Sequence, residues 1–394
     1  MSCNDRTGLA VPGSDMPGMG AAPDSGRQRP SECLWRARAA GRLMGGFNNS
    51  YTCKAADLLR RLKAMRLTYL YHSGFWLETD SCHIVIDFFR DGYDCKPEER
   101  RKGGVARAIG SIGTDSLVCC DEMENLEGLK VSPADCKSPG VLGRMLLNPG
   151  KPLYIMCTHF HKDHFLPFVM KIYEYALQRR AEDASYPEVR LVFSRDIRRS
   201  RKKSCGVHID AINFIAKGET YEDELLKVDA YGSTDVGSSF GITVKDNGFH
   251  FFHAGDFNYW HWQEESSEKE VQEAHEFFRS ELAFIAQRVT GFDAILFPVD
   301  PRMQTNISAG AQEFFNSIPY QLLVPVHVIE KPDFTCSDLQ NNELFATWEM
   351  QRGPCNEDSA RPLMLAGAQD AKSLIRRIWL PENAGDSCCI DLQS

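Results

Sequence analysis

The feature that most constrains this chain is a group of histidines that directly follows a short apolar run. Residues 153–157 read LYIMC, as expected for a buried strand, and residues 158–165 then read THFHKDHF. The candidate ligands in this segment are His159, His161, Asp163 and His164. Neutral imidazole and carboxylate groups suit zinc, iron and manganese, and alternate residues of an extended chain point the same way. The pattern therefore predicts a metal site where a strand ends.

A histidine-rich surface loop is the alternative interpretation of the same residues. Such a loop would need no partners elsewhere in the chain. Other apolar runs are nevertheless followed by further residues of ligand type, namely Asp87, Asp256 and His327. We therefore favour the metal site.

Both strands and helices are expected along the chain, which predicts a layered α/β protein rather than an all-α or all-β one. Asn247-Gly248 is a strong hairpin signal, because this pair tolerates the positive φ angles of a tight turn. Strands are expected at residues 66–71, 83–88, 153–157, 189–193, 228–231, 240–245, 249–253, 294–299 and 322–326. Helices are expected at residues 52–65, 166–177, 267–289 and 310–315.

Composition divides the chain into segments. Residues 1–64 are expected to be a disordered N-terminal extension, since most of them are Gly-, Pro-, Ser- and Arg-rich and bury little apolar surface. Residues 65–335 are the expected folded domain, and the weak periodicity of residues 92–150 indicates an insertion within it. Residues 336–394 are treated as a C-terminal extension for which the pattern predicts no defined structure.

The overall composition limits the partners and the compartment. The net charge of −9 argues against nucleic acid as a partner, and the basic run at residues 195–203 is interpreted as a solvated helix face. No apolar run approaches the ~20 residues of a membrane span, so no membrane is expected. The 14 scattered cysteines are interpreted as reduced thiols of a cytoplasmic protein without a secretion signal. A small-molecule substrate is the expected partner, and homo-oligomerisation is left open.

The HxHxDH pattern resembles the metallo-β-lactamase superfamily, and the landmarks that follow it agree in order over residues 65–330. The resemblance implies an α/β fold with four layers, an αββα sandwich. It implies a site one that uses His159 and His161, and a site two that uses Asp163, His164 and His327. Asp256 would bridge the two sites, and Asp87 would support them without binding metal.

One landmark departs from the family pattern. The family has another histidine between HxHxDH and the bridging aspartate, which completes site one. At that place the chain reads YGSTD over residues 231–235, so Asp235 or Thr234 would have to supply an oxygen. His208 is a poor substitute, because it precedes an expected helix. One or two Zn²⁺ ions are therefore expected, with iron or manganese as alternatives.

Several other residues are candidates for positions around the site. His72, in the segment YHSGF, is expected to support the ligands, because a branch of the superfamily has a histidine near the site there. His261 lies in an aromatic stretch where Trp260 or Trp262 would line the pocket or pack in the core. Asp300 and Arg302 would hold an anionic group or form a structural ion pair.

The resemblance implies a zinc-dependent hydrolase in which a metal-bound hydroxide attacks an ester, amide, thioester or phosphodiester bond. Asp256 would hold this hydroxide and Asp163 would handle the proton, which makes these two the expected catalytic residues. A nuclease or phosphodiesterase on the same fold is the first alternative, and it predicts a basic rim around the pocket. A non-hydrolytic metal-binding or sensing protein is the second, and the missing histidine favours it.

Overall fold

The computed structural model describes residues 65–89, 142, 145–146, 149–260, 265–328, 331–355, 363–366 and 375–393. All of them belong to the larger of the two units into which the chain divides, Leu58–Ser394. The predicted extension at residues 1–64, most of the predicted insertion at residues 92–150, and His261 with Trp262 lie outside the described residues.

The first sheet has eight strands in the order β14-β16-β1-β2-β3-β4-β5-β6. Strands β1 to β3 are antiparallel neighbours, whereas β3 to β6 run parallel. The carboxyl ends of β3 and β4 therefore lie side by side, which brings Asp87 next to the histidine motif. The bounds are β1 Met65–Tyr71, β2 Gly74–Glu78, β3 His83–Ile86, β4 Leu153–Cys157, β5 Val189–Ser194, β6 Ile212–Ile215, β14 Leu363–Ala366 and β16 Ser387–Gln393.

The second sheet also has eight strands, in the order β13-β15-β12-β11-β10-β9-β8-β7. Strands β10, β11 and β12 run parallel, so the residues after them, Asp256, Asp300 and His327, leave the sheet at one edge. The bounds are β7 Thr220–Glu222, β8 Leu226–Tyr231, β9 Ser239–Val244, β10 His250–His253, β11 Phe292–Pro298, β12 Tyr320–Val326, β13 Glu349–Arg352 and β15 Arg377–Leu380.

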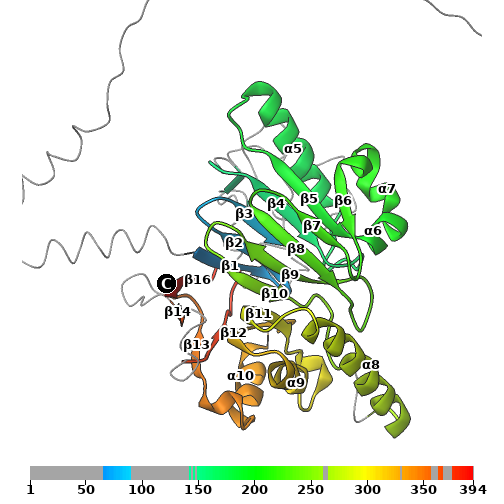
Figure 1. The fold of residues 1–394 in the computed structure, drawn as a ribbon, viewed down its shortest axis with the longest axis vertical. Helices are drawn as coiled ribbons and strands as arrows, with labels where there is room; N and C mark the ends of the chain where they lie inside the picture. The colour runs from blue at the N-terminus through cyan, green and yellow to red at the C-terminus, as the bar shows by residue number, and fades with distance from the viewer. Residues whose placement is uncertain are drawn as a thin grey trace, which may run out of the picture. The chain divides into compact units, whose positions relative to one another are not determined.

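Helices cover the outer faces of both sheets (Figure 1). Helix α5 packs on the first sheet, and α8 and α9 pack on the second. The helix bounds are α5 Phe168–Glu182, α6 Arg195–Ser200, α7 Lys202–Cys205, α8 Glu268–Ala286, α9 Ala309–Ser317 and α10 Pro332–Asn341. Short 3-10 turns lie at η4 Gly206–Ala211, η5 Pro301–Met303 and η6 Phe345–Thr347.

The strand sequences explain the four layers. In β3, Ile84 and Ile86 point into the core between the two sheets, whereas Val85 points toward α5. In β11, Ala294 and Leu296 face the other sheet, and Ile295 packs against the helices beyond. Because successive strand residues face opposite sides, strands that are apolar throughout must be buried on both faces. The predicted αββα sandwich is the fold observed.

The region after residue 335 adds to both sheets, although the sequence pattern predicted no structure there. Strand β16 pairs with β1, placing Ile390 opposite Met65, and β15 pairs with β12. Strands β13, β14 and β15 were not predicted because they have only four residues each, too few to show a period. Among the helices in the described part of the chain, none combines the length and apolar character needed to cross a bilayer.

Candidate metal centre

Asp87 joins the first sheet to the histidine motif. Its carboxylate accepts hydrogen bonds from the backbone N–H of Thr158 at 2.7 Å and from the Thr158 hydroxyl at 2.6 Å. It also lies 2.7 Å from Nδ1 of His164. Burial alone would raise the pKa of this carboxyl, but the adjacent His164 outweighs that effect and lowers it. Asp87 thus lies behind the imidazole of His164.

The residues predicted for site one lie together. Nε2 of His159 is 3.1 Å from Nδ1 of His161 and 3.3 Å from Oδ2 of Asp256. Asp235 completes this group, with its Oδ2 3.4 Å from Nδ1 of His161. One ligand atom from each of these four residues lies within 4.8 Å of the others. Asp235 therefore occupies the place for which the sequence offered no histidine.

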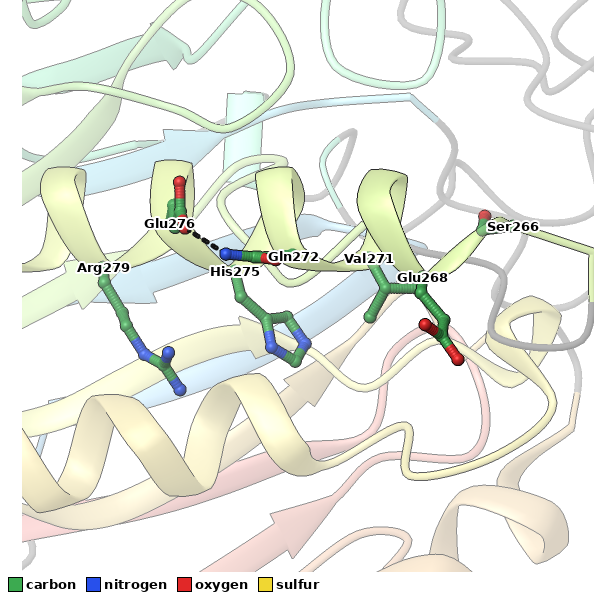
Figure 2. Close-up of a pocket in the computed structure, with 7 residues that line it drawn as sticks. All are labelled: Ser266, Glu268, Val271, Gln272, His275, Glu276 and Arg279. Carbon is green, nitrogen blue, oxygen red and sulfur yellow. Dashed lines mark hydrogen bonds between the residues drawn. The ribbon is translucent and has the colours of Figure 1, made fainter.

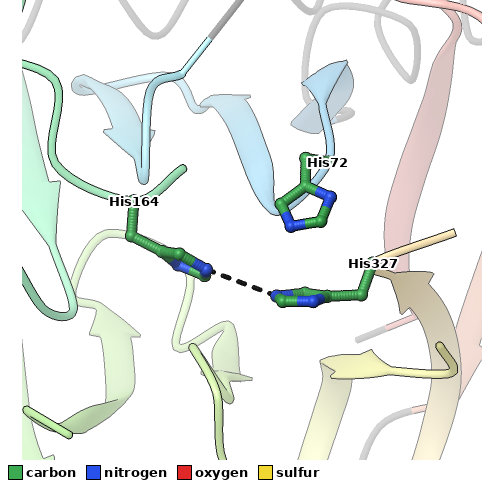
Figure 3. Close-up of side chains that lie close together, drawn as sticks. All are labelled: His72, His164 and His327. Atoms are coloured by element: carbon green, nitrogen blue, oxygen red, sulfur yellow. Dashed lines mark hydrogen bonds between the residues drawn. The ribbon is translucent and has the colours of Figure 1, made fainter. Parts of the chain in front are cut away.

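The residues predicted for site two also lie together, at the edge where the two sheets meet. Nε2 of His164 is 3.3 Å from Nε2 of His327. Figure 3 draws this contact as a dashed line between the two rings. Oδ1 of Asp256 lies 2.8 Å from Nε2 of His327 and 3.0 Å from Nε2 of His164. Asp163 is farther away, with its Oδ2 3.9 Å from Nε2 of His164. Asp256 therefore turns one oxygen to each predicted site.

His72 extends the second group. The turn between β1 and β2 places its ring centroid 4.0 Å from that of His327 and 6.0 Å from that of His164. One ring nitrogen of each of the three histidines lies within 4.8 Å of the others. Burial and the neighbouring His327 lower the pKa of His72 to about 4, which keeps its imidazole neutral at pH 7.

The donor set and the orphaned polar atoms match what a cation requires. Oδ1 of Asp256 and Nε2 of His72 are buried, yet neither makes a hydrogen bond within the described residues. Burial raises the pKa of Asp256, but the imidazoles of His164 and His327 outweigh it and hold the pKa well below its usual range. An ionised, buried carboxylate with imidazole nitrogens on both sides is a suitable environment for two metal ions.

No protein-family model and no curated protein matches the sequence significantly. Among solved structures, the chain is similar to the metallo hydrolase Igni18 of Ignicoccus hospitalis, with 13% identity, 84% of this chain and 100% of that chain covered, and a TM-score of 0.43. It is also similar to the metallo-β-lactamase fold protein YhfI of Bacillus subtilis, with 10% identity, coverage of 83% and 99%, and a TM-score of 0.39.

A third similar structure is the diiron β-hydroxylase CmlA of Streptomyces venezuelae, with 10% identity, 84% of this chain and 54% of that chain covered, and a TM-score of 0.41.

The observation that decides the fold lies in the chain itself. Its two eight-stranded sheets pack face to face between helices, and the HxHxDH loop follows β4 at their common edge. The chain has the metallo-β-lactamase fold.

Within this metallo-β-lactamase fold, buried carboxylates hold the outer nitrogens of the site-two imidazoles. Nδ1 of His164 faces Asp87, and Nδ1 of His327 lies 3.3 Å from Oδ2 of Asp300. Burial raises the pKa of Asp300, but His327 and Arg302 outweigh it and lower the pKa to about 2. Carboxylates in this position orient a ligand histidine and make it more basic. Asp300 and Arg302 also form an ion pair, which is the structural alternative considered for them.

Contacts that the sequence did not predict hold the motif loop in place. The backbone N–H of Phe160 donates to Asp196 at 3.0 Å, and Arg201 donates to the Phe160 carbonyl at 2.9 Å. Gly237, with φ of +76°, packs so closely that a Cβ there would lie 2.4 Å from the Cβ of His159. Part of the basic run therefore fixes the motif. Strand and turn patterns give no sign of such contacts between distant loops.

The remaining candidates differ in their surroundings. Trp260 lies beside the centre, with its ring 5.8 Å from that of His327 and its Nε1 donating to the Asp256 carbonyl at 2.6 Å. Thr234 donates instead to the carbonyl of Asn258. His208 faces Glu174 on α5, with 3.6 Å between Nε2 and the carboxylate, and belongs to neither group.

A surface hollow of about 580 Å³ lies elsewhere, along the outer side of α8 (Figure 2). The residues lining it are Ser266, Glu268, Val271, Gln272, His275, Glu276 and Arg279. None of the ligand candidates is among them. Gln272 and Glu276 are joined by a hydrogen bond of 2.7 Å, an ordinary contact along an exposed helix. The hollow therefore adds nothing to the metal centre.

Proposed function

We propose that the chain is a metal-dependent hydrolase whose centre holds two divalent ions, one on each side of Asp256. The observation that carries this proposal is the position of the Asp256 carboxylate. Its Oδ2 is 3.3 Å from His159, whereas its Oδ1 is 2.8 Å from His327 and 3.0 Å from His164. Site one would consist of His159, His161 and Asp235, and site two of His164, His327 and Asp163. Zinc is the preferred metal, with iron or manganese as alternatives.

Bound divalent metal would supply Lewis acidity, which generates a hydroxide nucleophile from water at neutral pH. Asp256 would keep the two ions together, because an ionised carboxylate presents an oxygen to each. Asp163 would accept the proton. Burial raises its pKa, but the imidazoles of His72 and His164 hold that pKa well below its usual range, so the group is ionised at neutral pH. Its side chain is 34% exposed, so it can exchange protons with solvent.

The expected substrates are small molecules with an electrophilic carbonyl or phosphorus centre. His161 and Asp235 are each about 40% exposed, whereas the site-two imidazoles are buried. A substrate would therefore approach from the side of site one. An ester, amide, thioester or phosphodiester bond would be cleaved.

The test is metal content and turnover of the purified full chain. Two equivalents of metal per chain are expected, together with hydrolysis of at least one substrate in a panel of esters, lactones, thioesters and phosphodiesters. The double variant His159→Ala, Asp256→Ala should lose metal from both sites and all turnover, because it removes the shared ligand. His208→Ala is the matched control and should keep both. Normal metal content in the double variant would contradict the proposal.

A non-hydrolytic protein with a single metal is the second candidate. The observation that favours it is Asp235, an exposed carboxylate in place of a third imidazole in site one. This candidate predicts one equivalent of metal, held by the residues of site two, and no turnover with any substrate of the panel. The same two measurements therefore separate the candidates.

A further inference from the structure

The turn between β1 and β2 carries a histidine where the backbone favours other residues. Tyr71 pairs with Gly74, so His72 and Ser73 form a two-residue hairpin turn. His72 has a φ of +59°. Such turns strongly favour Asn, Asp and Gly, because the left-handed conformation is costly for most side chains. A buried histidine at this position is explained more readily by what its ring contacts than by the turn itself.

Three residues outside the turn hold it in place, Tyr69 from the preceding strand and His253 and His327 from distant parts of the chain. The backbone N–H of His72 donates to the Tyr69 hydroxyl at 2.7 Å, and its carbonyl accepts from the backbone N–H of His327 at 3.4 Å. The next carbonyl, of Ser73, accepts from Nε2 of His253 at 2.9 Å. A Cβ at Gly74 would lie 2.9 Å from the carbonyl oxygen of Asp87, so the turn packs directly against the centre. The imidazole of His72 is thus held in one place.

His253 shows what a structural histidine in this region looks like. Its Nε2 donates to the Ser73 carbonyl, and its Nδ1 accepts from the backbone N–H of Gly255 at 3.2 Å. Both ring nitrogens therefore have partners. His72 differs, because its Nε2 is buried and makes no hydrogen bond in the described structure. Its ion-pair partner is Oδ2 of Asp163, 3.2 Å away, and this contact leaves the nitrogen without a hydrogen bond.

We propose that His72 is itself a metal ligand, in place of Asp163, and that site two is a centre of three imidazoles, His72, His164 and His327, completed by Asp256. The inference rests on the proposed function, because it concerns the same centre. Figure 3 shows the three rings converging, each from a different segment of the chain. Three imidazole nitrogens and one shared carboxylate oxygen favour zinc, cobalt or iron over magnesium and calcium. Site two would therefore take up such a metal first.

The experiment uses the full-length chain, stripped of metal and titrated with Co²⁺, whose visible absorption reports its ligands. The variant is His72→Gly, because glycine accepts the positive φ and leaves space for free imidazole. His208→Gly is the matched control. His72→Asn, which also suits the turn, replaces the glycine variant if that one unfolds at a lower temperature.

In His72→Gly, affinity for the first Co²⁺ should fall by more than about 100-fold, beyond the 10- to 100-fold typical of losing a residue that only supports a ligand. The absorption of this first Co²⁺ should change, and added imidazole should restore both. An unchanged spectrum, or a changed one that imidazole fails to restore, would assign His72 a supporting role only. His164→Ala distinguishes the two proposals: if it abolishes binding while His72→Gly does not, only the present inference fails. A wild-type chain that binds no Co²⁺ would refute both.

Discussion

The two halves of the centre share Asp256 but differ in what lies behind their imidazoles. In site two, buried carboxylates face the outer nitrogens, Asp87 behind His164 and Asp300 behind His327. In site one, Nδ1 of His159 faces only the Thr158 hydroxyl at 3.2 Å, and His161 is 40% exposed. Site two is therefore organised before metal arrives, whereas site one remains partly open to solvent. Site two would provide metal affinity, and site one would provide access for the substrate.

The largest change in this comparison should come from Asp300→Asn. The substitution removes the charge behind His327, and losing such a partner typically lowers metal affinity 10- to 100-fold. Only the tighter of two binding events should weaken, because Asp300 makes no contact with His159 or His161. Calorimetric titration of the metal-free chain with Zn²⁺ measures both events.

Asp229→Asn, on β8, is the matched control for that substitution and should leave both events unchanged. If Asp300→Asn weakened the second event instead, the assignment of the tight site to His164 and His327 would be wrong.

A smaller effect is expected from Asp235, the carboxylate beside His161 in the proposed site one. Asp235→Ala should weaken the second Zn²⁺ about tenfold, at the lower end of the usual range because this residue and His161 are largely solvated. Asp235→His should strengthen the second event by supplying a third imidazole. The first event should stay the same in both variants. Identical titration curves for the unmodified chain, Asp235→Ala and Asp235→His would show that Asp235 does not hold metal.

The smallest effect should follow from Arg302→Lys. The Arg302 side chain is 52% exposed, and its ion pair with Asp300 has solvent on one side. Replacing it should lower the free energy of unfolding by less than about 1 kcal/mol. Because Asp300 stays ionised, metal affinity at site two should hardly change. Chemical denaturation and the same titration check both statements, and a loss of affinity as large as that of Asp300→Asn would mean that Arg302 itself organises the site.

Much of this centre was predictable because its ligands directly follow strands. Apolar runs such as LYIMC are visible in the sequence, and the resemblance to the metallo-β-lactamase superfamily implied that His159, Asp256 and His327 share one centre. For His72 the sequence predicted only a supporting position. Its position depends on a turn held by Tyr69, His253 and His327, and such contacts leave no periodic signal.

The C-terminal strands escaped prediction for a different reason. Strand β16 pairs with β1 from the opposite end of the described chain, and Ile390 lies opposite Met65. Pairing between such distant segments is not encoded in any local pattern. Strand β15 is recognisable only from its burial, since Ile378, Trp379 and Leu380 are fully covered by the layers around them. The position of Asp300 also has no local signal, because its carboxylate contacts His327, which follows the next strand.

The central claim is that Asp256 lies between two metal ions. Anomalous scattering at the zinc edge from crystals of the zinc-loaded full chain tests it most directly. Two peaks are predicted, one among His159, His161 and Asp235 and one among His72, His164 and His327, with an oxygen of Asp256 facing each. A single peak, or peaks that the Asp256 carboxylate does not contact, would contradict the account.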